Sequence, residues 1–195
     1  MKKDIILAGV GGQGILSIAA IIGTAALDMG LYLKQSEVHG MAQRGGDVSS
    51  NLRIGDKEVA SDLIAMGKAD LVISVEPMEG LRYLPMLSPE GWLITNSKPF
   101  INIPNYPEIE SVYSEIAKVH RHVILDAEQI AKDLGSAKAA NVVILGAASA
   151  QMGIDFEIFE KAIHTIFGKK GEAVVELNIN ALRAGRDFAA KNSHL

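Results

Sequence analysis

The chain of 195 residues contains no cysteine. It therefore forms no disulfide, offers no thiolate nucleophile and lacks the usual cysteine ligands of an iron–sulfur cluster. If such a cluster takes part in the chemistry of this protein, another chain must hold it.

Aromatic residues and positive charge are also scarce. Phe, Trp and Tyr make up 5% of the chain, so small aliphatic side chains must supply most of the core. The 19 Lys and Arg are outnumbered by 23 Asp and Glu, which gives a formal net charge of -4. A nucleic-acid-binding protein needs a basic surface that this balance does not provide. We therefore expect no nucleic-acid partner.

Long hydrophobic runs are missing as well. The most apolar stretch, residues 15–27, is interrupted by Ser17, Gly23 and Thr24 and is shorter than the roughly 18–20 residues of a membrane span. Asp4 and the glycines beyond it break the pattern of a secretory signal near the N-terminus. We expect no membrane association and a cytoplasmic location.

Hydrophobic periodicity predicts alternating strands and helices. Strands are expected at residues 4–9, 31–38, 47–54, 71–75, 91–95 and 122–125, and helices at residues 12–29, 78–87, 127–134, 139–152, 156–167 and 172–190. Residues 97–110 contain three prolines and no clear period, which predicts a long ordered loop.

The third of these strands interrupts the alternation. Polar and apolar residues alternate from 47 to 54, and the turn residues Gly55 and Asp56 predict a hairpin that continues through residues 58–60. The chain is thus predicted to be a single α/β domain over residues 1–195. We expect a Rossmann-like, three-layer domain with a mainly parallel sheet, an antiparallel excursion near residues 47–60 and a helical C-terminal third.

The junction between the first strand and helix is rich in glycine. Gly9, Gly11, Gly12, Gln13 and Gly14 have the spacing of a dinucleotide fingerprint in its usual context of strand, turn and helix. Gly11 and Gly12 would let the backbone approach an anion at the helix N-terminus, and Gly14 would allow close packing of helix on strand. Alternatively, the glycines only make a tight crossover without a ligand.

An ordinary NAD site also has an acidic residue near the end of its second strand. Here the acid is Glu37, which lies several residues beyond the roughly 20-residue spacing that such a site prefers. This spacing counts against a stand-alone NAD(P)-dependent oxidoreductase, which stays open as an alternative.

Residues 36–46 bring an acid, an imidazole, an amide and a guanidinium into one glycine-bounded loop, as Glu37, His39, Gln43 and Arg44. Ligands of open α/β sheets bind at the carboxyl ends of the strands, where this loop is expected. Arg44 could pair with a carboxylate or phosphate, and His39 could donate a proton or orient a carbonyl. Alternatively, Glu37 and Arg44 bridge each other and hold the loop.

These motifs together resemble a known family. The glycine turn at residues 9–14, the Ser-Glu-Val of residues 36–38 and Arg44-Gly45-Gly46 resemble the gamma-type subunits of 2-oxoacid:ferredoxin oxidoreductases, and the match runs nearly the full length. In many members the arginine directly follows the Glu-Val step. This chain inserts five residues before it, and that longer version on a free-standing chain is similar to the small (beta) subunit of indolepyruvate:ferredoxin oxidoreductase.

The resemblance implies oxidative decarboxylation of an arylpyruvate to its acyl-coenzyme A, with electrons passed to ferredoxin. It also implies a large alpha subunit that carries thiamine diphosphate, magnesium and 4Fe–4S clusters. Coenzyme A would be a cosubstrate. This chain would hold none of those cofactors and no metal, and on its own it would be inactive.

The resemblance and the motifs together give a set of candidate site residues. Candidates for ligand binding are Gly9, Gly11, Gly12, Gln13, Gly14, Gln43, Arg44, Gly45, Gly46 and Asn141, and candidates for catalysis are Glu37, His39 and Arg44. The hypothesis is that the glycine turn and Arg44 receive the coenzyme A phosphates or the 2-oxoacid carboxylate. The alternative is a non-catalytic scaffold that orders the active site of its partner.

Overall fold

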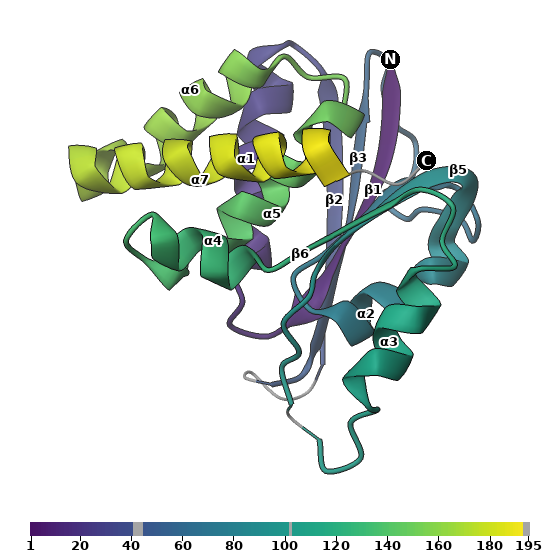
Figure 1. Cartoon of the computed structure of the whole chain (residues 1–195). Helices are drawn as coiled ribbons and strands as arrows, with labels where there is room; N and C mark the ends of the chain where they lie inside the picture. Colours follow the sequence, from purple (N-terminus) through teal and green to yellow (C-terminus); the bar gives the residue numbers. More distant parts are fainter. Residues whose placement is uncertain (41–44, 102, 193–195) are drawn as a thin grey trace.

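The computed structural model describes residues 1–40, 45–101 and 103–192. Six strands form one sheet in the order β2-β3-β1-β4-β5-β6 (Figure 1). Their bounds are Lys2–Val10 (β1), Tyr32–His39 (β2), Asp47–Gly55 (β3), Ala69–Ser74 (β4), Leu87–Asn96 (β5) and His122–Leu125 (β6). β3 runs antiparallel to both of its neighbours, and the other strands run in a common direction.

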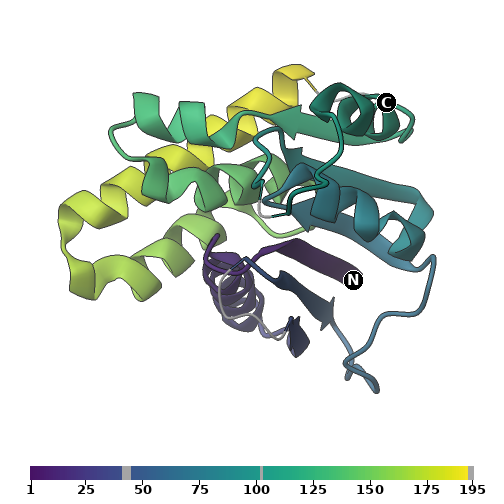
Figure 2. The ribbon, with the colours of Figure 1, turned by 90° about the horizontal axis from the view of Figure 1, so that it is seen from below.

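Helices cover both faces of this sheet. In the part of the chain that the structure describes, the α-helices are Ile15–Asp28 (α1), Pro77–Arg82 (α2), Ile109–Ile116 (α3), Ala127–Asp133 (α4), Ala140–Ala148 (α5), Phe156–Phe167 (α6) and Glu172–Asn192 (α7). α2 and α3 lie to the right of the sheet in Figure 1, and the others lie to the left. α7 lies beside α5 and α6 (Figure 2).

The central strand β1 explains why both faces need covering. Ile5 and Leu7 are fully buried against α1 and the C-terminal helices, whereas Ile6 faces the smaller cluster formed with Val112 and Ile116 of α3. Successive side chains of a strand point to opposite faces, so the continuous apolar run that begins at Ile5 must be buried on both.

The crossing of α5 and α7 is unusually close because two glycines face it. A Cβ on Gly146 would lie 2.0 Å from the backbone oxygen of Leu182, and one on Gly185 would lie 1.9 Å from the oxygen of Val143. The two helix backbones therefore touch directly. This contact fixes the position of α5, and the first turn of α5 forms one wall of the candidate site.

The structure confirms the predicted three layers, the mainly parallel sheet, the antiparallel strand and the helical C-terminal third. Two expectations fail: the hairpin after Gly55, and the helix over residues 78–87, since α2 ends at Arg82 and β5 already begins at Leu87. Residues 56–68 form no strand, because β3 already pairs with β1 and β2 on its two sides and leaves no edge for a hairpin. The short helix α3, which buries Val112 and Ile116 one turn apart, was not expected.

Candidate functional site

The glycine turn joins β1, which ends at Val10, to α1, which begins at Ile15. Gly12 and Gly14 have φ angles of 101° and 83°, a left-handed backbone that side chains other than glycine rarely adopt. The side chain of Gln13 folds back, and its Oε1 accepts the Val10 N–H at 2.8 Å. Gln13 therefore stabilises the turn from within.

Two of the glycines are required by close neighbours. A Cβ on Gly9 would lie 2.3 Å from Cγ2 of Val75, and one on Gly14 would lie 2.6 Å from Nδ2 of Asn141. Asn141 donates a hydrogen bond from Nδ2 to the Gly14 oxygen at 3.0 Å. The expectation that Gly14 serves the packing of helix on strand is therefore wrong. Gly14 lets α1 approach α5, and it is Gly9 that packs closely against the end of β4.

A cleft of about 460 Å³ opens beside the turn, at the carboxyl ends of β1, β4 and β5. Its polar lining includes Gln13, Ser17, Asn96, Glu128, Lys138 and Asn141. The cleft lies between the first turns of α1 and α5. β1 is followed by a helix on one face of the sheet and the adjacent β4 by a helix on the other, which is where open α/β sheets bind ligands.

Two helices at this cleft, α1 and α5, have no acidic side chain in their first turn. Gly14 precedes α1 and Ala139 precedes α5, and neither residue caps its helix through a side chain. The first amide of α5, that of Ala140, donates to the Ala137 oxygen of the preceding 3-10 turn. The unpaired N–H groups at the start of α1 favour an anion, and the helix dipoles of α1 and α5 act in the same direction. Lys138 adds a positive charge at the rim, partly offset by Glu128, which pairs with Lys132 at 4.0 Å.

Sequence reasoning missed Asn96 and Lys138. Asn96 is buried at the end of β5, donates to the Val75 oxygen at 3.2 Å and accepts the Ala127 N–H at 3.2 Å, so it ties two strand ends to α4. A signal existed, since Asn96 directly follows the predicted strand 91–95 at its carboxyl end. Lys138 had no such signal, because its short turn before α5 brings it to the cleft only in three dimensions.

Glu37 and His39 lie on the far side of the glycine turn. Nε2 of His39 contacts a carboxylate oxygen of Glu37 at the end of β2, and Gln35 donates to Glu37 at 3.4 Å. His39 lines a second cleft of about 390 Å³ with Gly11, Leu16 and Val48. The glycine turn thus separates His39 from the cleft that contains Asn141, so the candidate residues form two groups.

The return of the 40–46 segment contacts the glycine turn directly. The Gly46 oxygen accepts the Gly11 N–H at 2.9 Å, and Gly45 has a left-handed φ of 77°. Gln43 and Arg44 lie outside the described residues, so their place in the candidate site stays a prediction.

The strand order also bears on dinucleotide binding. β3 separates β2 from β1, so Glu37 lies two strands away, roughly 10 Å at about 4.8 Å per strand spacing. In the usual dinucleotide fold the second strand is next to the first and brings its acid to the ribose. Here that position is occupied by Asp47, which is opposite Val10 and belongs to the antiparallel strand.

Among the described residues, no group of three or more His, Cys, Asp or Glu side chains is placed to hold a metal ion. No described helix has both the length and the hydropathy to cross a membrane. With no cysteine in the chain, the residues present do not fit an iron–sulfur cluster of the usual type.

The chain is similar to known proteins over nearly its whole length. Residues 4–188 match the sequence family described as pyruvate ferredoxin/flavodoxin oxidoreductase. The indolepyruvate oxidoreductase subunit IorB of Archaeoglobus fulgidus is 39% identical over 198 residues, covering 97% of this chain and 96% of that one.

Two solved structures share the fold. The gamma subunit of a keto/oxoacid ferredoxin oxidoreductase from Geobacter sulfurreducens PCA has a TM-score of 0.71 at 28% identity, covering 97% of this chain and 99% of that one. The 2-oxoglutarate:ferredoxin oxidoreductase of Magnetococcus marinus, solved with 2-oxoglutarate, coenzyme A and succinyl-CoA bound, has a TM-score of 0.77 at 22% identity, covering 97% of this chain but 31% of that longer one. The chain therefore belongs to the pyruvate ferredoxin/flavodoxin oxidoreductase family and is a small subunit of a 2-oxoacid:ferredoxin oxidoreductase.

Proposed function

We propose that this chain is the small subunit of an oxidoreductase that prefers indolepyruvate and related arylpyruvates. The similarity to IorB across the whole chain supports this substrate class. The reaction would yield the acyl-coenzyme A and pass electrons to ferredoxin through a large alpha subunit. That partner would hold thiamine diphosphate, magnesium and 4Fe–4S clusters, because this chain has no cysteine to ligate a cluster. A cytoplasmic location is part of the same proposal.

The substrate preference is tested with the assembled complex. Ferredoxin reduction is measured with indolepyruvate, phenylpyruvate, pyruvate, 2-oxoisovalerate and 2-oxoglutarate as alternative substrates, each with coenzyme A. The two arylpyruvates should have kcat/KM values at least about tenfold above the others, because an aromatic group buried in a fitted site gains more than about 1.4 kcal/mol over a small one. A higher kcat/KM for 2-oxoglutarate or pyruvate would contradict the proposed substrate class and leave the family membership intact.

The cleft beside the glycine turn is proposed to receive the coenzyme A phosphates. The observation that carries this proposal is the meeting of the uncapped start of α1, the first turn of α5, Lys138 and Asn141 around one cleft of about 460 Å³. That volume is within the range of small-molecule sites, about 300–1,000 Å³. Arg44, from the segment that returns beside Gly11, is proposed to contribute a further positive charge.

Replacing Lys138 with alanine in the assembled complex should raise the KM for coenzyme A about tenfold and leave kcat nearly unchanged. A charge-assisted hydrogen bond to phosphate contributes about 1.5–3 kcal/mol, and exposure reduces that to the lower end. Lys169→Ala is the control, because Lys169 is also an exposed lysine in a 3-10 turn and does not line the cleft.

The other outcomes of this measurement separate the alternatives. A raised KM for the 2-oxoacid, with coenzyme A unaffected, would place the substrate carboxylate in the cleft. Unchanged kinetics with intact assembly would exclude the anion site and favour the scaffold alternative, in which the chain only orders the active site of its partner.

A further inference from the structure

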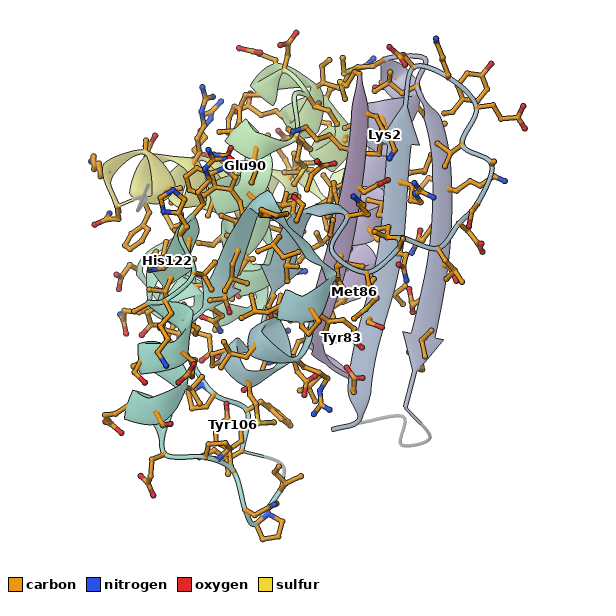
Figure 3. All side chains as sticks on the ribbon, turned by 90° about the vertical axis from the view of Figure 1, so that its right-hand side faces the viewer. Lys2, Tyr83, Met86, Glu90, Tyr106 and His122 are labelled. Carbon is orange, nitrogen blue, oxygen red and sulfur yellow. The ribbon has the colours of Figure 1, made fainter. Side chains whose placement is uncertain are left out.

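Two acidic side chains meet on the α2 side of the sheet, behind the glycine turn. Asp47 is the first residue of β3 and is paired with Val10 at the end of β1. Glu79 lies in the first turn of α2 and is only 3% exposed. Tyr83 follows α2 (Figure 3). Its hydroxyl donates to Oδ2 of Asp47 at 3.0 Å.

The two carboxyl groups have fewer hydrogen-bond donors around them than two ionised carboxylates need. Oδ1 of Asp47 is buried and has no donor among the described residues. The Glu79 carboxyl interacts directly with that of Asp47, and its oxygens also accept from Nε and Nη2 of Arg82 at 2.8 and 3.4 Å. Two ionised carboxylates can only accept, and in a buried site they repel. A proton on one of them turns the repulsion into an O–H···O bond.

We propose that Asp47 and Glu79 share one proton, and that this bond fastens the start of β3 to α2 and thereby positions Gly40 and Gly46, the second of which contacts the glycine turn. The pair itself does not depend on any ligand, so the proposal goes beyond the assigned function. Asp47 and Glu79 act here as positioning residues.

The surroundings of the pair favour a retained proton. Burial is the largest cause that raises the pKa of Glu79, and it reaches about 7 because the charge of Asp47 acts in the same direction while Arg82 opposes both. Tyr83 and Tyr106 also face Glu79, and burial raises the pKa of each, so they stay neutral donors. Glu76, the remaining acid nearby, is held separately by the Tyr106 hydroxyl and the Glu79 and Phe100 N–H groups.

The backbone of Asp47 explains why this bond positions these two glycines. Its oxygen accepts the Gly40 N–H at 2.8 Å, and the neighbouring Gly46 oxygen accepts the Gly11 N–H at 2.9 Å. Both ends of the 40–46 segment are therefore attached at or next to Asp47. Loss of the shared proton brings two charges together at this point and loosens the attachment.

The stability of the full chain should consequently fall as pH rises from about 5 to 8. Glu79 holds its proton in the folded chain up to about pH 7 but releases it near 4.5 when unfolded, so the folded state binds more protons in this window. The unfolding equilibrium constant should rise by on the order of 10²-fold across it. Urea unfolding at several pH values measures this change.

Glu79→Gln is the diagnostic variant, because glutamine keeps the shape and donates an N–H to Asp47 at every pH. Its unfolding midpoint should be nearly flat over the window and should exceed that of the wild type at pH 8. The unfolding midpoint of Asp47→Asn should also be nearly independent of pH over this window. Glu115→Gln, an exposed acid paired with Lys118, is the control and should keep the pH dependence of the wild type. If the unfolding midpoint of Glu79→Gln depended on pH as steeply as that of the wild type, the shared proton would be contradicted.

Hydrogen exchange of the Gly40 amide tests the positioning. After correction for intrinsic exchange rates, this amide should be at least about tenfold better protected at pH 6 than at pH 8 in the wild type, and equally protected at both in Glu79→Gln. Equal protection at both pH values in the wild type would mean that the pair does not control the position of Gly40.

Discussion

Gly146→Ala should lower the free energy of unfolding by about 3 kcal/mol, at the upper end of the usual cost of overpacking. The new Cβ would lie 2.0 Å from the Leu182 oxygen, a backbone atom that cannot move without shifting α7. The helices must then separate along a contact that buries much of the core. Urea unfolding of the full chain measures the loss.

Gly168→Ala provides the matched control for this substitution. Gly168 directly follows α6, has an ordinary helical backbone like that of Gly146 within α5, and an added Cβ would meet nothing within 4 Å. Its alanine variant should have wild-type stability or slightly more, since alanine restricts the unfolded chain. If Gly146→Ala loses less than about 1 kcal/mol, the helices yield easily and the close crossing is not a firm support for the site.

Arg53→Ala should destabilise the chain by about 3 kcal/mol, because it leaves a buried carboxylate without its main partner. Arg53 donates from Nε and Nη2 to Asp4 at 2.8 and 3.1 Å, and Asp4 is 1% exposed. The two residues are opposite each other in the pairing of β1 with β3, the strand pair that leads to the glycine turn. Lys2, at 2.8 Å from Asp4, remains and compensates only in part.

The pair of Arg53 and Asp4 should also affect how the free energy of unfolding depends on pH in acid. Burial alone would raise the pKa of Asp4, but hydrogen bonds from Arg53 and Lys2 outweigh it and hold the pKa below 3.8. Stability from this carboxylate is therefore complete above that pH and is lost as pH falls through and below it. The free energy of unfolding of Arg53→Ala should therefore fall less on acidification than that of the wild type. Arg183→Ala, which removes an exposed ion pair with Glu160, should change neither stability nor its pH dependence measurably.

Much of the fold follows from local sequence signals. The bounds of β6 and α6 agree with the prediction, because the apolar run of β6 ends at Asp126 and the helical period of apolar residues in α6 ends at Gly168. The glycine turn was also predictable, since Gly12 and Gly14 need left-handed angles that few other residues adopt. These features depend on neighbours in sequence.

The features that escaped prediction depend on neighbours in space. The contact of Gly14 with Asn141 joins residues 127 positions apart, and no periodic pattern reports it. The hairpin expected after Gly55 failed for the same reason, because the partners of β3 are β1 and β2 rather than the residues that follow.

The separation of Glu37 from the glycine turn has a similar origin. In sequence order β2 follows β1, and only the insertion of β3 between them shows that the acid is two strands away. Lys138 reaches the cleft because α4 and α5 return to the edge where β1 ends. Side chains brought together by topology are the part of a binding site that composition and spacing do not report.

Reconstitution from separately purified subunits tests most directly the claim that this chain is a non-redox subunit of an arylpyruvate-oxidising complex. Ferredoxin reduction with indolepyruvate and coenzyme A is measured under anaerobic conditions for the large subunit alone, for this chain alone, and for the mixture. We expect activity in the mixture only, with thiamine and iron–sulfur absorbance in the large subunit. Full activity of the large subunit alone, or NAD(P)H-linked activity of this chain alone, would contradict the claim.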